Sequence, residues 1–239
     1  TANRHYHAAL QLADELSVAS LKAGLNLVRS AEPDERLAQL TALSARIGRS
    51  PVGRTDPSLY LNLGHQAHAL GPSGLALAYS SIERARQMTS DQPASRLHLE
   101  SLDGLAQLYE AQGRLPEALG LTRRALDALR RDALHTGGDL QIAQEWRLAR
   151  IYRQQGQPAL ALAAYQRAVD QVELLRQDIP IDYDDGQSSF RVTLEPVYLG
   201  LVDSLLRSHD GQGPVQQQVV LRRARDAVLD RRRKAHADR

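Results

Sequence analysis

Residues 104–126 read GLAQLYEAQGRLPEALGLTRRAL, residues 147–169 read RLARIYRQQGQPALALAAYQRAV, and the two stretches superpose without a gap. Both contain L-A-x-x-Y-x-x-Q-G, followed by an Ala five residues after the Gly and a second Ala seven residues later. The apolar residues recur three and four positions apart, which is the spacing of one face of an α-helix. Gly tolerates the left-handed backbone that ends many helices. Each stretch therefore predicts two helices joined at the Gly.

The same pattern extends outward from these stretches, in weaker copies. Each copy has a Leu at the position of Leu105, and these anchor leucines are Leu21, Leu63, Leu105, Leu148 and Leu201. They follow one another at intervals of 42, 42, 43 and 53 residues. The pattern predicts five helix pairs, at residues 5–47, 57–88, 95–131, 138–176 and 188–230. In the first pair we expect one long helix over residues 5–30, with its partner over residues 34–47.

The combination of Leu, a small residue, Tyr, Gly and two Ala resembles the tetratricopeptide repeat (TPR). This resemblance implies an all-α fold, a right-handed α-solenoid of about five helix-turn-helix pairs. The repeat of about 42 residues exceeds the ~34 residues of a standard TPR, which predicts extra helical turns or longer connections. We interpret residues 1–235 as a single solenoid, with a basic tail at residues 231–239. Glu145 departs from the pattern, because the family places a large apolar residue there, and Trp146 stands beside it.

Composition narrows the functional classes. The chain has 239 residues, including 39 Leu and 33 Ala, and it contains no Cys. Without Cys there is no disulfide, no Cys-ligated metal and no Cys nucleophile in these residues. No apolar run approaches the ~20 residues of a membrane-spanning helix. We therefore expect a protein that is not an enzyme and has no membrane span, no cofactor and no metal. His65 and His68 share a helix face but lack a third ligand nearby.

A second resemblance lies in residues 171–207, QVELLRQDIPIDYDDGQSSFRVTLEPVYLGLVDSLLR. The residues that carry it are Val172, Glu173, Leu175, Arg176, Ser189, Phe190, Arg191, Val197, Tyr198, Leu201, Val202, Asp203, Leu205 and Leu206. They resemble the last repeat before the caspase-like peptidase domain of bacterial TPR–CHAT proteins. This resemblance implies a sensor or regulatory arm, with a caspase-like domain downstream in a full-length chain. The family's His and Cys pair belongs to that domain, so no catalytic role transfers to any residue here.

The TPR resemblance also implies a binding site for a protein or peptide, because the first helix of each pair lines the concave groove of the solenoid. The positions two residues before, two after and five after each anchor Leu face this groove. They select Leu61, His65, His68, Asp103, Gln107, Glu110, Trp146, Arg150 and Arg153. Trp and Arg dominate many binding hot spots, which favours Trp146 as an anchor for the partner. In the other interpretation, Trp146 replaces the large core residue displaced by Glu145.

Other functions remain open from the sequence. One is a stand-alone TPR adaptor or secretion chaperone, and another is a solenoid that binds nucleic acid through the basic run at residues 231–234. Residues 221–239 carry a net charge of +5 and residues 1–220 a net charge of −3, so nucleic acid is the less favoured partner. Cations also stabilise a helix C-terminus. Terminal repeats can expose apolar faces, so homo-oligomers through the solenoid ends are a further expectation. The compartment stays open between the cytoplasm and, if a leader preceded Thr1, export.

Overall fold

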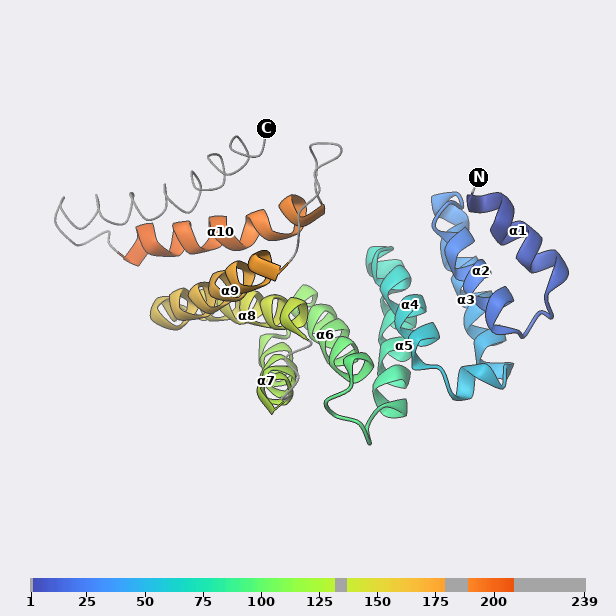
Figure 1. The fold of residues 1–239 in the computed structure, drawn as a ribbon, viewed down its shortest axis with the longest axis horizontal. Helices are drawn as coiled ribbons and strands as arrows, with labels where there is room; N and C mark the ends of the chain where they lie inside the picture. The colour runs from blue at the N-terminus through green and yellow to red at the C-terminus, as the bar shows by residue number, and fades with distance from the viewer. Residues whose placement is uncertain (1, 132–136, 179–188, 209–239) are drawn as a thin grey trace. The chain divides into compact units, whose positions relative to one another are not determined.

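A computed structural model describes residues 2–131, 137–178 and 189–208 of the chain (Figure 1). Within these residues the chain forms ten α-helices and two short 3-10 helices, and no strand. The prediction of an all-α fold is therefore confirmed. The helices divide into two compact units, Thr1–Leu134 and His135–Arg239, and each unit is described by itself. The single solenoid over residues 1–235 stays a prediction.

Unit 1 contains seven of the α-helices. In chain order they are α1 (Ala2–Leu12), α2 (Val18–Val28), α3 (Pro33–Arg49), α4 (Pro57–His68), α5 (Leu75–Met88), α6 (Arg96–Ala111) and α7 (Leu115–Arg131). The two 3-10 helices are η1 (Val52–Arg54) and η2 (Gly71–Gly74). Helices α4 and α5 pack together, as do α6 and α7, and these two pairs correspond to the predicted pairs at residues 57–88 and 95–131. The chain between α5 and α6, together with η2, accounts for part of the long repeat spacing.

The prediction of one helix over residues 5–30 is wrong, because α1 ends at Leu12 and α2 begins at Val18. The Asp14 carboxylate accepts a hydrogen bond from the backbone N–H of Leu16 at 2.8 Å. Ser17 then caps α2, since its hydroxyl accepts from the N–H of Ser20 at 3.2 Å. Asp and Ser side chains of this kind compete with the helical backbone for its donors. The apolar periodicity runs across this break and concealed it.

Unit 2 contains α8 (Gly138–Gln154), α9 (Pro158–Asp178) and α10 (Ser189–Ser208). Helices α8 and α9 form the predicted pair at residues 138–176, and α10 packs on α9. The second helix of the predicted pair at residues 188–230 and the basic tail at residues 231–239 lie outside the described residues.

The motif glycines end the helices that precede them. Gly113 and Gly156 have φ angles of 71° and 69°, in the left-handed region that Gly adopts at little cost. The backbone N–H after each Gly returns to the preceding helix, from Arg114 to the carbonyl of Tyr109 and from Gln157 to that of Tyr152, both at 2.9 Å. These are the 6→1 bonds expected at a glycine-ended helix, so the turn chemistry predicted from the repeats is confirmed.

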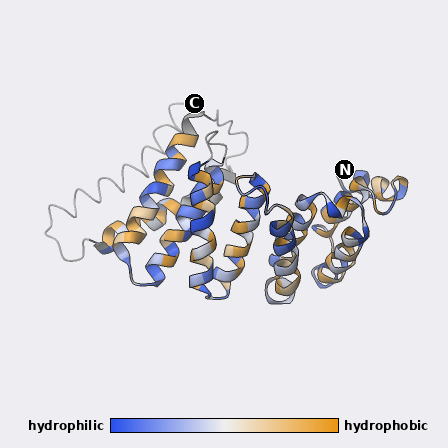
Figure 2. Ribbon diagram, turned by 90° about the horizontal axis from the view of Figure 1, so that it is seen from below, coloured by the Kyte–Doolittle hydropathy of each residue, from blue (hydrophilic) through white to orange (hydrophobic). Residues whose placement is uncertain are grey.

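Close packing between helices depends on small residues. The paired alanines of the two motif copies are buried, namely Ala118 and Ala125 in unit 1 and Ala161 and Ala168 in unit 2. Figure 2 shows hydrophilic and hydrophobic residues interleaved along the described helices, so each helix buries one face and leaves another to solvent. Among the described residues, no helix has both the length and the apolar character needed to cross a membrane.

Candidate functional site

The nine residues predicted to face a groove lie on the first helix of three pairs: α4 and α6 in unit 1, and α8 in unit 2. On α4, His65 is exposed and His68 is half-buried, whereas Leu61 is only 4% exposed and belongs to the core. On α6, Gln107 and Glu110 are half-buried and Asp103 is 8% exposed. In unit 1, therefore, His65, His68, Gln107 and Glu110 remain available to a partner, while Leu61 and Asp103 support them from beneath.

Three of these residues converge between α4 and α6. A Cβ placed on Gly104 of α6 would lie 3.3 Å from Cε1 of His65, so the imidazole sits directly against the neighbouring helix. Beside it, Asp103 accepts a hydrogen bond from Nε2 of Gln107 at 2.7 Å. The pKa of His65 is lowered because surrounding protein atoms exclude water from the ring, against the opposing charges of Asp103 and Glu100. An exposed side chain that is nevertheless desolvated lies on a concave surface, which agrees with a groove at this point.

His65 and His68 do not form part of a metal centre visible in the structure. The described residues contain no group of three or more His, Asp or Glu side chains arranged to hold a metal ion. His68 also lowers the pKa of His65 by charge repulsion, so the two rings disfavour simultaneous protonation.

In unit 2, the predicted residues of α8 form a stacked aromatic–cation pair and an ion pair. The guanidinium carbon of Arg150 lies 4.4 Å from the ring centroid of Trp146, within the range of a cation–π interaction. Trp146 is half-buried, and Arg153 is exposed. Arg153 reaches α10, where its Nη1 donates to Asp203 at 3.2 Å. This bridge puts the predicted face of α8 next to a face of α10.

The residues on α10 were missed by the sequence reasoning, although the signal was present. The same rule of two before, two after and five after, applied to the anchor Leu201, selects Leu199, Asp203 and Leu206. Asp203 is the ion-pair partner of Arg153. Leu199 and Leu206 are exposed to 56% and 40%, and they rank among the exposed large hydrophobic residues of the chain.

The departure at Glu145 has a structural explanation. Glu145 is only 1% exposed, and both of its carboxylate oxygens accept from Arg167 of α9, at 2.9 Å from Nε and 2.8 Å from Nη2. These bonds raise the pKa of the Arg167 guanidinium. A bidentate ion pair thus occupies the place of the large apolar residue of the repeat, while Trp146 stays half-buried beneath Arg150.

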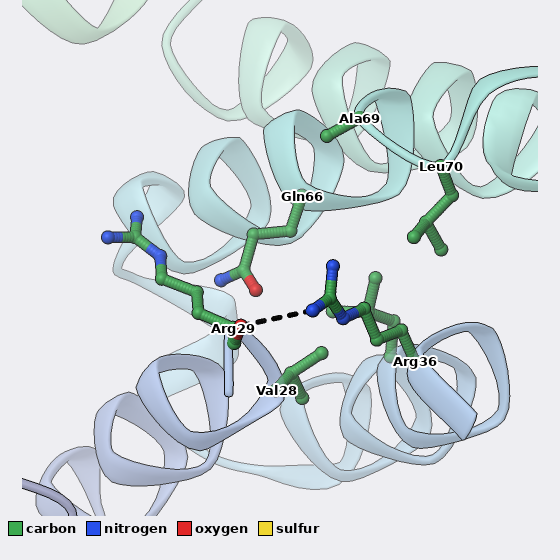
Figure 3. A pocket seen from close by; sticks show the side chains of 7 residues that line it. Val28, Arg29, Arg36, Gln66, Ala69 and Leu70 are labelled. Carbon is green, nitrogen blue, oxygen red and sulfur yellow. Dashed lines mark hydrogen bonds between the residues drawn. The ribbon is translucent and has the colours of Figure 1, made fainter. Parts of the chain in front are cut away.

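A small pocket of about 150 Å³ lies among α2, α3 and α4 (Figure 3). Arg36 projects into it, and its Nε and Nη2 donate to the carbonyls of Ala31 and Arg29 at 2.9 and 3.4 Å. Gln66 donates across it to the carbonyl of Leu25 at 2.9 Å. These side chains satisfy carbonyls at the C-terminal end of α2, where helices leave acceptors without partners. The polar groups of the pocket therefore serve the packing of the three helices.

A tyrosine pair joins α5 to α6 outside the groove positions. The rings of Tyr79 and Tyr109 meet edge to face with centroids 6.1 Å apart, and their hydroxyls are 3.3 Å apart. This hydrogen bond is the main reason that the pKa of Tyr109 is raised. Arg114 covers the other side of Tyr109, 4.4 Å from its centroid. The Tyr of the repeat motif thus contributes to the contact between consecutive pairs.

Comparison with solved structures places the chain among TPR-like repeat proteins. It is similar to the crystal structure of BtubC (BKLC) from P. vanneervenii, with a TM-score of 0.68, 16% identity, and 97% of this chain and 89% of that chain covered. It is also similar to the crystal structure of a variant of the putative kinesin light chain nearly identical TPR-like repeats from Podosopora anserina, with a TM-score of 0.63, 18% identity, and 92% and 99% covered. A further structure of the Podosopora repeats has a TM-score of 0.60 and 16% identity, with 90% and 97% covered.

No protein-family model and no curated protein matches the chain. At these identities the structural likeness shows the fold alone, which is an all-α arrangement of TPR-like helical repeats.

Proposed function

We propose that this protein is a non-catalytic scaffold that binds a segment of a partner protein on the exposed faces of α4, α6, α8 and α10. The observation that carries the proposal is the Trp146–Arg150 stack on α8, with the Arg153–Asp203 bridge beside it. A half-buried Trp under a guanidinium offers a partner both apolar area and charge, and residues of these two types dominate hot spots. Support also comes from the TPR-like fold, which generally serves protein–protein interaction rather than catalysis.

The two units offer different chemistry to a partner. The groove positions of α4 and α6 carry two histidines, two carboxylates and no cation. Those of α8 carry Trp146, Arg150 and Arg153. A partner that complements both units therefore needs segments of different charge, because juxtaposed like charges oppose association.

In its finer form, the proposal makes this protein the sensor or regulatory arm of a TPR–CHAT protein. Support comes from residues 171–207, which resemble the stretch that precedes a caspase-like domain in that family. A coding sequence that continues past residue 239 into a domain with a paired His and Cys supports this form. A stop codon there favours the alternative of a stand-alone adaptor or secretion chaperone.

The test is affinity capture from a lysate of the source organism, with the full chain as bait and mass spectrometry as the readout. The bait variant Trp146→Ala/Arg150→Ala removes the stacked pair on α8. The control variant Tyr79→Ala/Arg114→Ala removes an aromatic side chain and a stacked guanidinium outside the groove positions. We expect the first variant to lose proteins that the wild type and the control retain, with unchanged helicity by circular dichroism. Equal capture by all three baits refutes the proposed face.

A further inference from the structure

The exposed side of α10 carries two leucines in the same positions that α8 fills with Trp146 and Arg153. Leu199 and Leu206 lie two residues before and five residues after the anchor Leu201, and they are 56% and 40% exposed. The opposite side of α10 carries Val197, Leu201 and Ser204, all of them buried. At 100° per residue, Leu199 and Leu206 project within about 20° of each other. The helix therefore has an apolar stripe turned away from its own core.

This stripe continues the face that α8 begins. Arg153 of α8 contacts Asp203 of α10 at 3.2 Å, and Asp203 lies in sequence between the two leucines. Single exposed leucines are ordinary on protein surfaces. Two on one helical stripe, next to a helix that presents a half-buried Trp146, form an apolar patch of the kind that marks an interaction site.

The charges around the patch are unequal. Arg150 and Arg153 on α8 and Arg207 on α10 surround one carboxylate, that of Asp203, which accepts from Nε of Arg207 at 2.9 Å. These four side chains therefore have a net charge of +2. Positive charge around an apolar strip attracts a partner that carries carboxylates and repels one that carries cations.

The spacing of the leucines indicates the shape of the partner. Seven residues separate Leu199 from Leu206, which is about 10.5 Å along a helix axis. A second helix that lies along α10 presents its own apolar residues at the same seven-residue interval, as in helix-in-groove recognition.

We propose that the α8–α10 face binds an acidic amphipathic helix of a partner protein. The partner's aliphatic side chains pack on Leu199, Leu206 and Trp146, and its flanking carboxylates face Arg150, Arg153 and Arg207. This inference rests on the proposed function and names the class of partner that unit 2 binds.

Trp146 provides a direct readout, because it is the only Trp in the chain. The probe is a synthetic peptide of about three heptads with Leu at the a and d positions and Glu on its other face. Two matched peptides replace every Glu by Lys, or every Leu by Ala. Titrated into the full chain, the Leu/Glu peptide is expected to change Trp146 emission saturably, with binding that weakens as salt is raised. The Leu/Lys and Ala/Glu peptides are expected to bind at least tenfold more weakly.

The decisive variant is Leu199→Ala/Leu206→Ala, and its matched control is Leu160→Ala/Leu174→Ala. The control leucines are exposed to 48% and 58% but lie on α9. Loss of one buried Leu contact corresponds to about a tenfold loss of affinity. We therefore expect the α10 variant to bind the Leu/Glu peptide at least tenfold more weakly and the control to bind it like the wild type, with both variants fully helical by circular dichroism.

Three results overturn the inference: no saturable binding of the Leu/Glu peptide, equal binding of the Leu/Lys peptide, or equal weakening by the α9 control variant. Each is separable from failure of the proposed function. If capture of a natural partner depends on Trp146 and Arg150 while the α10 variant captures it normally, the scaffold function stands and the acidic-helix partner is refuted.

Discussion

Replacing Arg167 by Leu should destabilise unit 2 far more than replacing its partner Glu145 by Leu. Glu145 is 1% exposed and receives two hydrogen bonds from Arg167, whereas the Arg167 side chain is 44% exposed. The two halves of the pair are therefore not equivalent. Without Arg167, the carboxylate keeps its place in the interior and loses its bidentate cation. Without Glu145, the guanidinium is already half in solvent and can be hydrated.

The magnitudes follow from this difference in burial. Breaking a fully buried ion pair by removing one partner costs about 3–5 kcal/mol. Because Arg167 is half-exposed and water reaches the pair from its side, we expect about 2–3 kcal/mol for Arg167→Leu, at or below the low end of that range. Glu145→Leu restores the apolar residue that the repeat pattern calls for, and it should cost less than about 1 kcal/mol. The double variant Glu145→Leu/Arg167→Leu should regain most of the stability lost in Arg167→Leu, since apolar replacements of buried pairs are often neutral or stabilising.

The assay is urea unfolding at pH 7, followed by the fluorescence of Trp146, which reports on unit 2 because it is the only Trp and lies next to Glu145. The control is Arg130→Leu, which removes the exposed ion pair with Asp127 and should change the unfolding free energy by less than about 1 kcal/mol. Equal costs for Arg167→Leu and Glu145→Leu would refute the assignment of Glu145 as a carboxylate held in the interior by Arg167.

Three further predictions concern unit 1. Gly64→Ala should cost about 1–3 kcal/mol in urea unfolding followed by circular dichroism, because its Cβ would overlap Cγ1 of Ile82 in a packed core; Gly120→Ala, where the space is empty, should instead stabilise by up to about 1 kcal/mol. Burial and the charge of Arg86 lower the pKa of His98 below 6.5, so unfolding takes up a proton between the folded and unfolded pKa values. Stability should therefore be complete above pH 6.5 and fall as pH drops through that window, and His98→Gln should flatten this slope between about pH 8 and pH 5. Arg36→Met should cost about 1 kcal/mol by leaving carbonyls at the end of α2 without a donor, and an unchanged urea midpoint would contradict that role.

The parts of the fold that were predictable from sequence are those fixed by local chemistry. Gly113 and Gly156 could be assigned to turns because only Gly adopts their backbone cheaply, and the buried Ala118 and Ala161 followed from their distance to those turns. The break before Val18 was missed because helical periodicity alone does not register capping. Asp14 and Ser17 were the available signal, since both are residues that favour helix starts and turns.

The candidate site was less predictable, because exposure depends on neighbours that a single repeat does not contain. Leu61 and Trp146 hold the same position relative to their anchor leucines, yet Leu61 is buried and Trp146 is half-buried. The ion pair between Glu145 and Arg167 joins residues 22 positions apart, and no pattern within one helix indicates it. The register rule finds which residues share a face, and tertiary packing decides which of them a partner can reach.

The opposite charges of the two candidate faces give a way to test them separately in the intact chain. The groove positions of α4 and α6 include Asp103 and Glu110 and no cation, whereas the α8–α10 face has a net charge of +2. An acidic helix attracted to unit 2 is therefore repelled by unit 1, and added salt screens both the attraction and the repulsion. Charge reversal of Arg150 to Glu should weaken binding of an acidic peptide, and Glu110→Lys should leave it equal or stronger. If both changes weakened binding of that peptide equally, one site of uniform charge would account for it, and two chemically distinct faces would not.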